Sequence, residues 1–266
     1  YFTSLLSQGI NPCIDTQGAQ LRVNLSSLVS KPKIGDLIYL VFDKSNLISL
    51  KDKNVLSLNH PESYHQRQTR DILKVDFDGL ALEILEKDDM KKIIKSKVKA
   101  SGEVLVNRAI DIKNKSIKLD TLTEFDKFAI DYAISNGTKE IYASFISSAK
   151  EASYIKDKIG SSVKLISKIE TAKGLANVKE IIEVSDEILI DRGDLSREIS
   201  IPAIPMAVFN VIKIANEMDK PVSIATNVLD SMMSKNIPSR AEISDIFSHL
   251  SACLLYTSPS PRDLYR

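Results

Sequence analysis

Two neighbouring stretches, VKLISKIETAKG at residues 163–174 and DEILIDRGDLS at residues 186–196, decide the fold. Each contains a short apolar run, and residues 174–184 between them carry apolar side chains at helical spacing, so the segment predicts strand, helix, strand. The first run ends at Lys168 and Glu170. Because the carboxyl ends of buried parallel strands meet ligands, we expect a site there.

A second polar cluster, Asp191, Arg192 and Asp194, follows the second apolar run. Carboxylates and a lysine from neighbouring strand ends suit a hard divalent ion with an anionic substrate, since Mg²⁺ takes one or two carboxylates plus substrate oxygens. A pair of surface salt bridges beside two strands explains the spacing equally well, because charged side chains are common at protein surfaces.

The composition is that of a soluble globular protein. Of 266 residues, 43% are hydrophobic and 27% charged, with 36 Lys plus Arg against 35 Asp plus Glu. A net charge of +1 gives no global field for nucleic acid or an anionic membrane, so we expect neither partner. Cys13 and Cys253 form no disulfide framework, which favours a reducing, cytoplasmic compartment.

Both ends of the sequence are unusual. Tyr1 is not a natural start, so the chain is interpreted as a fragment. After His249 the apolar pattern of strands and helices ends. The stretch YTSPSPRD within residues 253–266 resembles translated sequencing-adapter read-through. We therefore interpret residues 253–266 as a non-native tail, with a natural Ser/Pro-rich tail as the alternative.

The pattern divides the rest of the chain into three parts. Residues 1–22 contain a short strand, NPCID, followed by Thr16 and Arg22. Residues 23–102 alternate apolar and polar side chains between turns such as KIGD and FDG, which predicts an inserted small antiparallel β-domain. Such an insert can close over a site as a lid, or can simply stabilise the fold. Residues 103–252 return to strand and helix in alternation.

One helix is predicted in detail at LTEFDKFAIDYAISNG, residues 122–137. Thr123 is the expected N-cap and Gly137 the expected C′ residue. Helical spacing predicts an inner face of Phe125, Phe128, Ala129, Tyr132 and Ala133.

Strands near Leu165, Leu189 and Val222 alternate with helices along the chain. This rhythm indicates parallel strands joined by right-handed crossovers. A closed (β/α) barrel and an open doubly wound sheet both fit it, and neither a Gly-rich dinucleotide fingerprint nor a P-loop is present.

Six stretches together resemble the pyruvate kinase family, in the order and approximate spacing of that family: CIDTQGAQLR (13–22), YASFI (142–146), ISKIE (166–170), DRGDL (191–195), KPVSIATNVLDSM (220–232) and IPSRAEISD (237–245). The ordered set is specific, although no single member would be. The resemblance implies a (β/α)₈ TIM barrel, present here in part, whose third strand is followed by a small β-barrel acting as a lid.

The resemblance implies transfer of a phosphoryl group from phosphoenolpyruvate to ADP, giving pyruvate and ATP. Glu170 and Asp194 are then similar to the ligands of Mg²⁺ or Mn²⁺, and Lys168 to the cation that stabilises the transferring group. Gly193 and Asp194 would offer backbone N–H groups to the substrate carboxylate.

Four further residues match family positions. Thr226 resembles the threonine beside the enolate carbon that is implicated in proton delivery, and Asp15 and Thr16 resemble ligands of a monovalent cation, K⁺. Arg22 resembles a contact for the transferring or nucleotide phosphates. Without the surrounding ATNVLDSM, Thr226 would be interpreted as an ordinary strand-end hydroxyl.

The sequence also departs from the family. Where this chain has Gln17, Ala19 and Gln20, members commonly carry Lys, Pro and Glu. They commonly carry Arg in place of Ser147, Ala in place of Asp191 and Gly in place of Ser196. In place of Asn227 and Asp230 they commonly carry Gln and Glu. Gln20 leaves potassium dependence open, because that position relates to it in the family. Asp191 adds a negative charge that could either tighten a cation or repel an anionic substrate.

Family parts that would precede Tyr1 and follow His249 are not in the sequence. A barrel without them has unpaired edges, so we expect this fragment neither to fold stably nor to turn over. The parent protein is expected to be a homotetramer. Two other functions stay open: a non-catalytic paralogue, and a metal-dependent aldolase or lyase that stabilises a pyruvate enolate.

Two remaining groups of residues suggest no chemistry. His60, His65 and His249 lack metal-ligand spacing and are predicted to be solvated. The basic run KKIIKSKVK, residues 91–99, could touch nucleotide phosphates, but a solvated β-edge guarded by lysines is the preferred interpretation.

Overall fold

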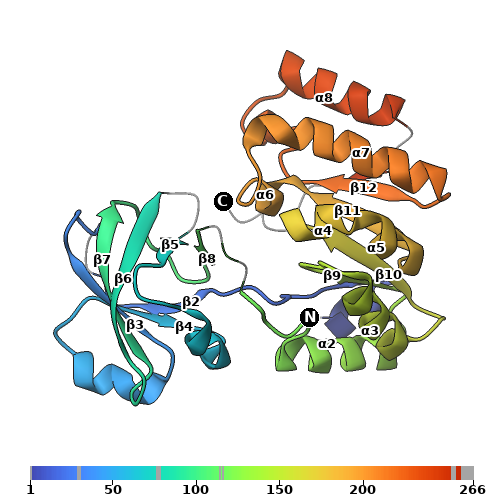
Figure 1. Cartoon of the computed structure of the whole chain (residues 1–266). Coiled ribbons are helices and arrows are strands. Elements are labelled where there is room, and N and C mark those ends of the chain that lie inside the picture. The colour runs from blue at the N-terminus through green and yellow to red at the C-terminus, as the bar shows by residue number, and fades with distance from the viewer. Residues whose placement is uncertain are drawn as a thin grey trace. The chain divides into compact units, whose positions relative to one another are not determined.

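The computed structural model describes residues 2–28, 31–75, 79–113, 115, 117–252 and 256–258 (Figure 1). The chain divides into two compact units, one of Tyr1–Ala19 with Thr121–Arg266 and one of Gln20–Asp120. Two residues of the predicted FDG turn, Phe77 and Asp78, and most of the predicted tail lie outside the described residues.

A six-stranded parallel sheet forms the first unit. Its strand order is β1 (Ile14–Asp15), β9 (Glu140–Ala143), β10 (Lys164–Ile169), β11 (Glu187–Asp191), β12 (Val222–Ala225) and β13 (Tyr256–Ser258). Apart from β1 and β9, between which the strands of the second unit lie in the chain, neighbours in the sheet are consecutive in the chain, so the predicted α/β architecture with parallel strands is confirmed. Three residues of the predicted tail form β13, beside β12.

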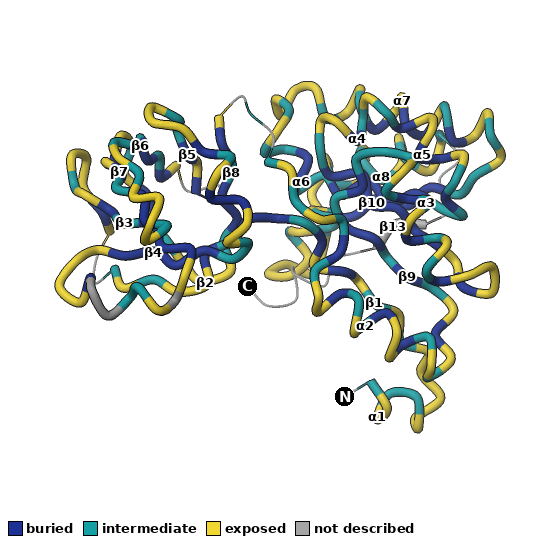
Figure 2. Tube along the Cα trace, turned by 60° about the horizontal axis from the view of Figure 1, so that its bottom comes forward, coloured by how far each residue is buried: buried dark blue, intermediate teal, exposed yellow. Residues whose placement is uncertain are grey.

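Three helices cover one face of this sheet: α3 (Ala149–Ile159), α5 (Val178–Val184) and α7 (Ile204–Glu217). Their buried residues pack with the strands in one apolar core, and Figure 2 shows the buried positions concentrated along the strands. On the other face a smaller cluster forms from Ile166, Leu189 and Ala225. Strands that are buried on both faces have continuous apolar runs in their sequence, and for this reason the apolar runs predicted these strands.

The predicted helix over 174–184 is divided into α4 (Ala172–Ala176) and α5. Asn177 separates them, with φ −106° and ψ 18°, and its side-chain amide donates to the Ser147 carbonyl at 2.8 Å. Gly174 lies so close to the Ile146 carbonyl that an added Cβ would be 2.7 Å from that oxygen. This close approach fixes the start of the segment against the end of β9.

Helix α2 (Glu124–Ser135) confirms its predicted caps, but of its predicted inner face only Ala133 is fully buried. Thr123 is the N-cap, and Gly137 has φ +83°. Phe125 and Phe128 are 60% and 66% exposed, so they do not pack inward. The prediction was wrong because the capping residue Asp126 turns toward the sheet and accepts hydrogen bonds from the amides of Gln17, at 2.8 Å, and Gly18.

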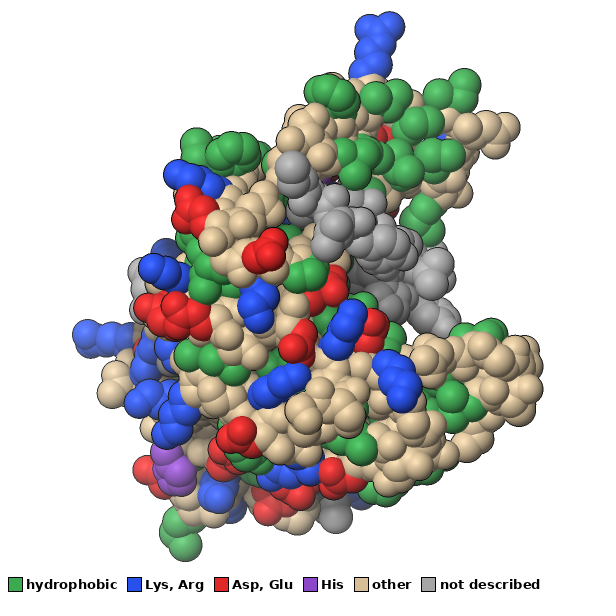
Figure 3. All heavy atoms as spheres, turned by 90° about the vertical axis from the view of Figure 1, so that its right-hand side faces the viewer, with side chains coloured by type: hydrophobic (Ala, Val, Ile, Leu, Met, Phe, Trp, Pro, Cys, Tyr) green, Lys and Arg blue, Asp and Glu red, His purple; other side chains and the backbone are tan. Residues whose placement is uncertain are grey.

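The first unit also contains the helices α1 (Phe2–Ser7), α6 (Arg192–Leu195) and α8 (Arg240–Ser251), and short 3₁₀ turns at Ile201–Ala203 and Asp230–Met233. Helix α8 leaves Ile243, Phe247 and Leu250 exposed. Figure 3 shows hydrophobic side chains gathered near the top of the face in view, where α7 and α8 lie. No helix within the described ranges is long and apolar enough to cross a bilayer.

The second unit is a seven-stranded sheet in the order β2 (Val23–Ser26), β4 (Val55–Leu58), β3 (Leu37–Val41), β7 (Ile93–Ala100), β6 (Leu80–Asp88), β5 (Ile72–Val75) and β8 (Ile110–Ile112). A bridge between Arg22 and Ala109 links the two ends of this order, so the sheet curls round on itself. The pairs are antiparallel except for β3 with β4, which are parallel. The unit extends past residue 102 because β8 pairs with β5.

The basic run 91–99 does not form an edge strand. It contributes β7, which lies between β3 and β6 in the middle of the sheet. Alternation places Ile94 and Val98 in the core, while Lys95 and Lys99 face outward and pair with Glu86 and Glu83 at 3.2 and 3.1 Å. The predicted solvated edge was therefore wrong, since period-two patterning alone does not distinguish a central strand from an edge.

Candidate active site

The carboxyl ends of β10, β11 and β12 bring the predicted site residues of the first unit together. Register pairs Lys168 with Leu189 and Asp191 with Ala225, so polar residues at and just after the strand ends meet at one edge. Parallel strands with matched ends necessarily collect such side chains there. The edge is therefore a built site and not a set of separate surface ion pairs.

Lys168 lies at the centre of this site and is 4% exposed. Its Nζ is 3.0 Å from Glu170 Oε1, 3.3 Å from Asp15 Oδ2 and 3.6 Å from Asp191 Oδ2. The Ser144 hydroxyl lies 3.3 Å from the same nitrogen. An ammonium removed from water is stabilised by such partners, so it can keep its charge inside the protein.

Glu170 is 1% exposed, and Oε2 accepts the Phe145 N–H at 2.6 Å. Burial raises the pKa of Glu170 to about 8, while Lys168 acts against this rise and the charges of Asp191 and Asp194 add to it. A carboxyl group surrounded in this way holds a proton near neutral pH unless a further positive charge arrives.

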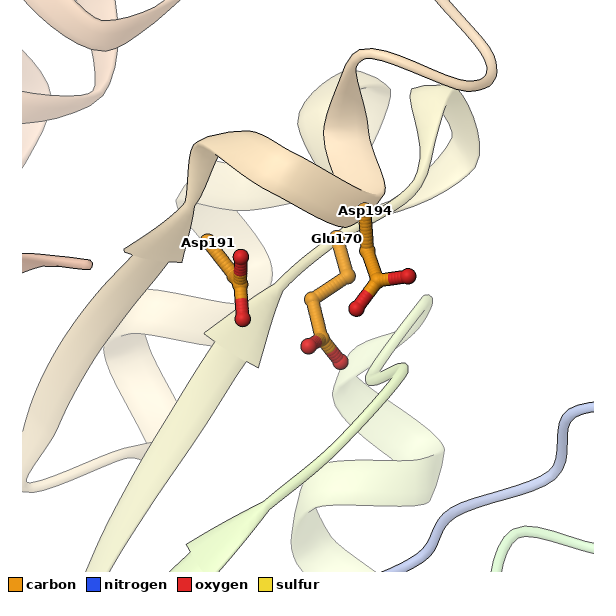
Figure 4. Close-up of side chains that lie close together, drawn as sticks. All are labelled: Glu170, Asp191 and Asp194. Carbon is orange, nitrogen blue, oxygen red and sulfur yellow. The ribbon is translucent and has the colours of Figure 1, made fainter. Parts of the chain in front are cut away.

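Three buried carboxylates, those of Glu170, Asp191 and Asp194, offer oxygens within 4.8 Å of one another. Figure 4 shows them directed into a common space from the end of β10, the end of β11 and helix α6. Hard oxygen donors at this spacing fit Mg²⁺ or Mn²⁺. The donor set therefore fits the predicted divalent ion, and it contains one carboxylate, Asp191, that the resemblance did not assign.

Asp191 makes two contacts through one oxygen. Its Oδ1 accepts the Thr226 hydroxyl at 2.6 Å and the Gly193 amide at 3.2 Å, so it is the N-cap of α6. The resemblance assigned that amide to the substrate carboxylate. In this structure a carboxylate of the chain itself accepts its hydrogen bond.

Thr226 has φ +76°, a conformation that costs a residue with a Cβ about 1–3 kcal/mol. Arg192 Nη2 donates to its carbonyl at 2.8 Å. Its methyl group fills the space where a side chain on Gly193 would begin, since an added Cβ would be 2.7 Å from Thr226 Cγ2. Glycine is required at that position by this contact.

Arg192 also anchors helix α8 to the edge of the site. Its Nη1 is 2.7 Å from Asp245 Oδ2 and 3.3 Å from His249 Nε2, and His249 is 2.9 Å from Asp245 Oδ1. The His249 side chain is 12% exposed, so its prediction as a solvated residue was wrong. Burial lowers the pKa of His249, and the Arg192 charge acts in the same direction while Asp245 opposes it.

The residues predicted for a monovalent cation lie at the neighbouring strand ends. Asp15 Oδ1 accepts the Ser144 hydroxyl at 3.0 Å, and Thr16 Oγ1 accepts the Ser144 amide at 2.9 Å. Sequence reasoning gave Ser144 no role, although it joins Asp15 to Lys168. Its position directly after β9 was the signal that could have found it.

Other departures from the family lie around this edge or in the second unit. Ser147 donates to Glu151 and accepts from Lys173 Nζ at 3.1 Å. Gln20 belongs to the second unit. Arg22, which matches the family, lies in the same unit, and its Nη1 donates to the Asn107 carbonyl at 3.0 Å.

Parallel strands, helical crossovers and a lysine among carboxylates at the strand ends define a parallel α/β domain with a candidate cation site. The family model described as "Pyruvate kinase, barrel domain" matches residues 4–252, and the chain belongs to the pyruvate kinase family.

Three relatives show the extent of the likeness. Pyruvate kinase isozyme G, chloroplastic, of Nicotiana tabacum is 32% identical over 239 residues, which is 88% of this chain and 41% of the relative. Pyruvate kinase of Thermotoga maritima is 30% identical over 217 residues, which is 78% of this chain and 46% of the relative. Pyruvate kinase of Schizosaccharomyces pombe is 30% identical over 237 residues, which is 88% of this chain and 46% of the relative. The chain spans about half the length of the curated relatives it matches.

Proposed function

We propose that the chain carries the active site for phosphoryl transfer from phosphoenolpyruvate to ADP, with uptake of one proton, giving pyruvate and ATP. The observation that carries the proposal is the buried Lys168 ammonium beside Glu170, at the strand edge that also holds Asp194. Membership of the pyruvate kinase family supports the same reaction.

Lys168 is the residue that stabilises the transferring phosphoryl group. Transfer of this kind depends on positioning and on positive charge around the equatorial oxygens. A lysine that is 4% exposed acts in a dry environment, where an electrostatic interaction is stronger than in water.

Glu170 and Asp194 would hold Mg²⁺ or Mn²⁺, and Asp15 and Thr16 would take part in holding K⁺. When bound, the divalent ion supplies charge neutralisation and orientation to the phosphoryl oxygens. Glu170 must lose its proton to act as a ligand, and the nearby Lys168 favours that loss.

Thr226 is proposed to lie beside the enolate carbon and to take part in its protonation. Its Oγ1 stands just past the end of β12 and donates to Asp191. Gly193 and Asp194 are proposed to contact the substrate carboxylate, which requires the Asp191 carboxylate to give up the Gly193 amide.

The other expectations concern the parent protein. We propose that the second unit acts as its lid, that Arg22 contacts phosphates, and that the parent is a cytoplasmic homotetramer. Cys13 is a free, exposed thiol, which suits a reducing compartment.

The test is a coupled assay of the full-length parent with phosphoenolpyruvate, ADP, Mg²⁺ and K⁺, run beside Lys168→Met. The matched control is Lys158→Met, since Lys158 pairs with Asp131 at 2.6 Å on the helical layer. We expect Lys168→Met to abolish pyruvate formation and Lys158→Met to keep it. Equal rates for the two variants would contradict the role of Lys168.

A non-catalytic relative is the second candidate, and one observation favours it. Asp191 adds a buried carboxylate where an anionic substrate would bind, and it occupies the Gly193 amide. A folded parent that binds Mn²⁺ but forms no pyruvate under varied Mg²⁺ and K⁺ would support this candidate.

A further inference from the structure

Asp191 and Thr226 form a short contact at the strand edge, and nothing in the proposed reaction assigns Asp191 a task. The Thr226 hydroxyl donates to Asp191 Oδ1 at 2.6 Å. Asp191 is 4% exposed, and the strand register that pairs it with Ala225 places the two residues side by side. A hydrogen bond to a buried carboxylate is a strong restraint on hydroxyl orientation.

The restraint acts on a residue that is already held at two other points. Arg192 Nη2 binds the Thr226 carbonyl at 2.8 Å, and the Thr226 methyl group leaves no space for a side chain on Gly193. The backbone of Thr226 is in the left-handed region at φ +76°. Surroundings that fix a strained residue so completely are typical of a side chain that must be accurately placed.

We infer that Asp191 is a positioning residue that sets the orientation of the Thr226 hydroxyl toward the substrate. The inference rests on the proposed function, in which Thr226 takes part in protonating the enolate carbon. Because Asp191 Oδ1 receives the hydroxyl hydrogen, the lone pairs of Thr226 Oγ1 are turned away from Asp191. Thr226 therefore meets the ligand or its proton donor as an acceptor until that hydrogen bond rearranges.

The same contact separates two effects of Asp191. Its charge lies 3.6 Å from Lys168 and opposes an anionic ligand, whereas its Oδ1 orients Thr226. Asparagine keeps the acceptor oxygen and removes the charge, while alanine removes both. Asp191→Asn should therefore lower KM for phosphoenolpyruvate and recover the proton-transfer step that Asp191→Ala impairs.

The experiment measures exchange of pyruvate methyl protons for deuterium by NMR, in the full-length parent with Mg²⁺, K⁺ and ATP. By microscopic reversibility, this exchange follows the same proton-transfer step as the forward reaction. Its rate does not depend on the rate of phosphoryl transfer. The proteins are wild type, Asp191→Ala, Asp191→Asn, Thr226→Val and Asp191→Ala with Thr226→Val. Thr138→Val is the control, because Thr138 is also a buried threonine but precedes β9, away from the carboxyl ends of the strands. Its hydroxyl donates to the Pro12 carbonyl at 3.0 Å.

We expect Asp191→Ala to lower the exchange rate about tenfold or more, because a misplaced catalytic group costs up to about 10²-fold. Asparagine should recover most of the loss, the double variant should be no slower than Thr226→Val, and Thr138→Val should exchange as wild type does. An exchange rate in Asp191→Ala equal to that of wild type would overturn the inference. A fold-reduction in the double variant equal to the product of the two single fold-reductions would overturn it as well.

A wild type that is folded but neither exchanges nor turns over overturns the proposed function instead. The unfolding free energies of wild type, Asp191→Ala, Thr226→Val and the double variant then test the contact by itself. Non-additive losses for Asp191→Ala and Thr226→Val support the pair, and additive losses overturn it.

Discussion

The Lys168 ammonium lies 3.0 Å from the Glu170 carboxylate, and the two residues are only 4% and 1% exposed. When both groups are ionised, a pair so far from water is held by mutual compensation, because each partner alone would be a buried, uncompensated charge. The charge state of each residue therefore depends on the other, and this dependence underlies the predictions for the site.

Replacing Lys168 with methionine should destabilise the protein in a pH-dependent way. Without the ammonium, Glu170 must either be buried as an unpaired anion or keep its proton. We expect a loss of about 3–5 kcal/mol near pH 8, as for other broken buried pairs, and a smaller loss near pH 5. Thermal unfolding of Lys168→Met and Lys158→Met across this range checks it, and a loss for Lys168→Met that is equal at both pH values would contradict it.

Glu170 should make the metal-free protein less stable as pH rises. Its pKa is raised to about 8 in the folded protein, so the folded state holds a proton that the unfolded chain releases above its ordinary glutamate pKa. The stabilising contribution is present below about pH 4.3 and is lost progressively up to about pH 8, by a few kcal/mol at most.

The measurement is the unfolding free energy against pH in the presence of a chelator. Glu170→Gln should be flatter over this window, because its amide does not titrate. Parallel curves for wild type and Glu170→Gln would show that another group controls the slope. Added Mg²⁺ should stabilise most at the upper end of the window, where Glu170 has lost its proton.

Asp194 should be needed for divalent-cation binding. Its carboxylate lies within 4.8 Å of those of Glu170 and Asp191, so Asp194→Asn removes one of three charges from the donor set. We expect Mn²⁺ affinity, measured by titration without substrate, to fall by about tenfold or more, equivalent to about 1.4 kcal/mol.

Glu187→Gln is the control for this titration, because Glu187 begins β11 and accepts the Ser223 hydroxyl at 2.6 Å. Its Mn²⁺ affinity should equal that of wild type. Equal losses in the two variants would indicate a general effect of charge and not ligation.

Asp245 should secure helix α8 to the site edge through Arg192. The two side chains are 34% and 14% exposed and 2.7 Å apart, so their interaction is only partly screened by water. Asp245→Ala should cost about 1–2 kcal/mol of unfolding free energy, between the values of exposed and buried pairs. Glu217→Ala, which removes an exposed pair with Lys213 on α7, should cost less than about 0.5 kcal/mol. Similar costs would contradict an anchoring role for Asp245.

The parallel sheet and the position of its site could be predicted because both depend on the order of strand ends. Lys168, Glu170 and Asp194 each follow an apolar run, and the sheet collects such residues at one edge. The position of Ser144 directly after a strand was a usable signal, but the hydrogen bonds of Asp191 and Ser144 could not be predicted, because they depend on the direction of side chains across neighbouring strands.

Two errors have a common physical cause. Helical spacing placed Phe125 and Phe128 on the inner face of α2, and His249 was assigned to solvent because it lacks metal-ligand spacing. In both cases hydrogen bonds of a polar residue decide the orientation: Asp126 binds the amides after β1, and Asp245 holds His249 near Arg192. Tertiary hydrogen bonds of this kind leave no periodic signal in a sequence.

The measurement that tests the central claim most directly is pyruvate formation from phosphoenolpyruvate by the full-length parent, with and without ADP, at saturating Mg²⁺ and K⁺. A phosphoryl-transfer site built on Lys168, Glu170 and Asp194 predicts pyruvate only when ADP is present, with ATP formed in equal amount. Pyruvate formed at the same rate without ADP, or none formed by a folded parent that binds Mn²⁺, would contradict the account.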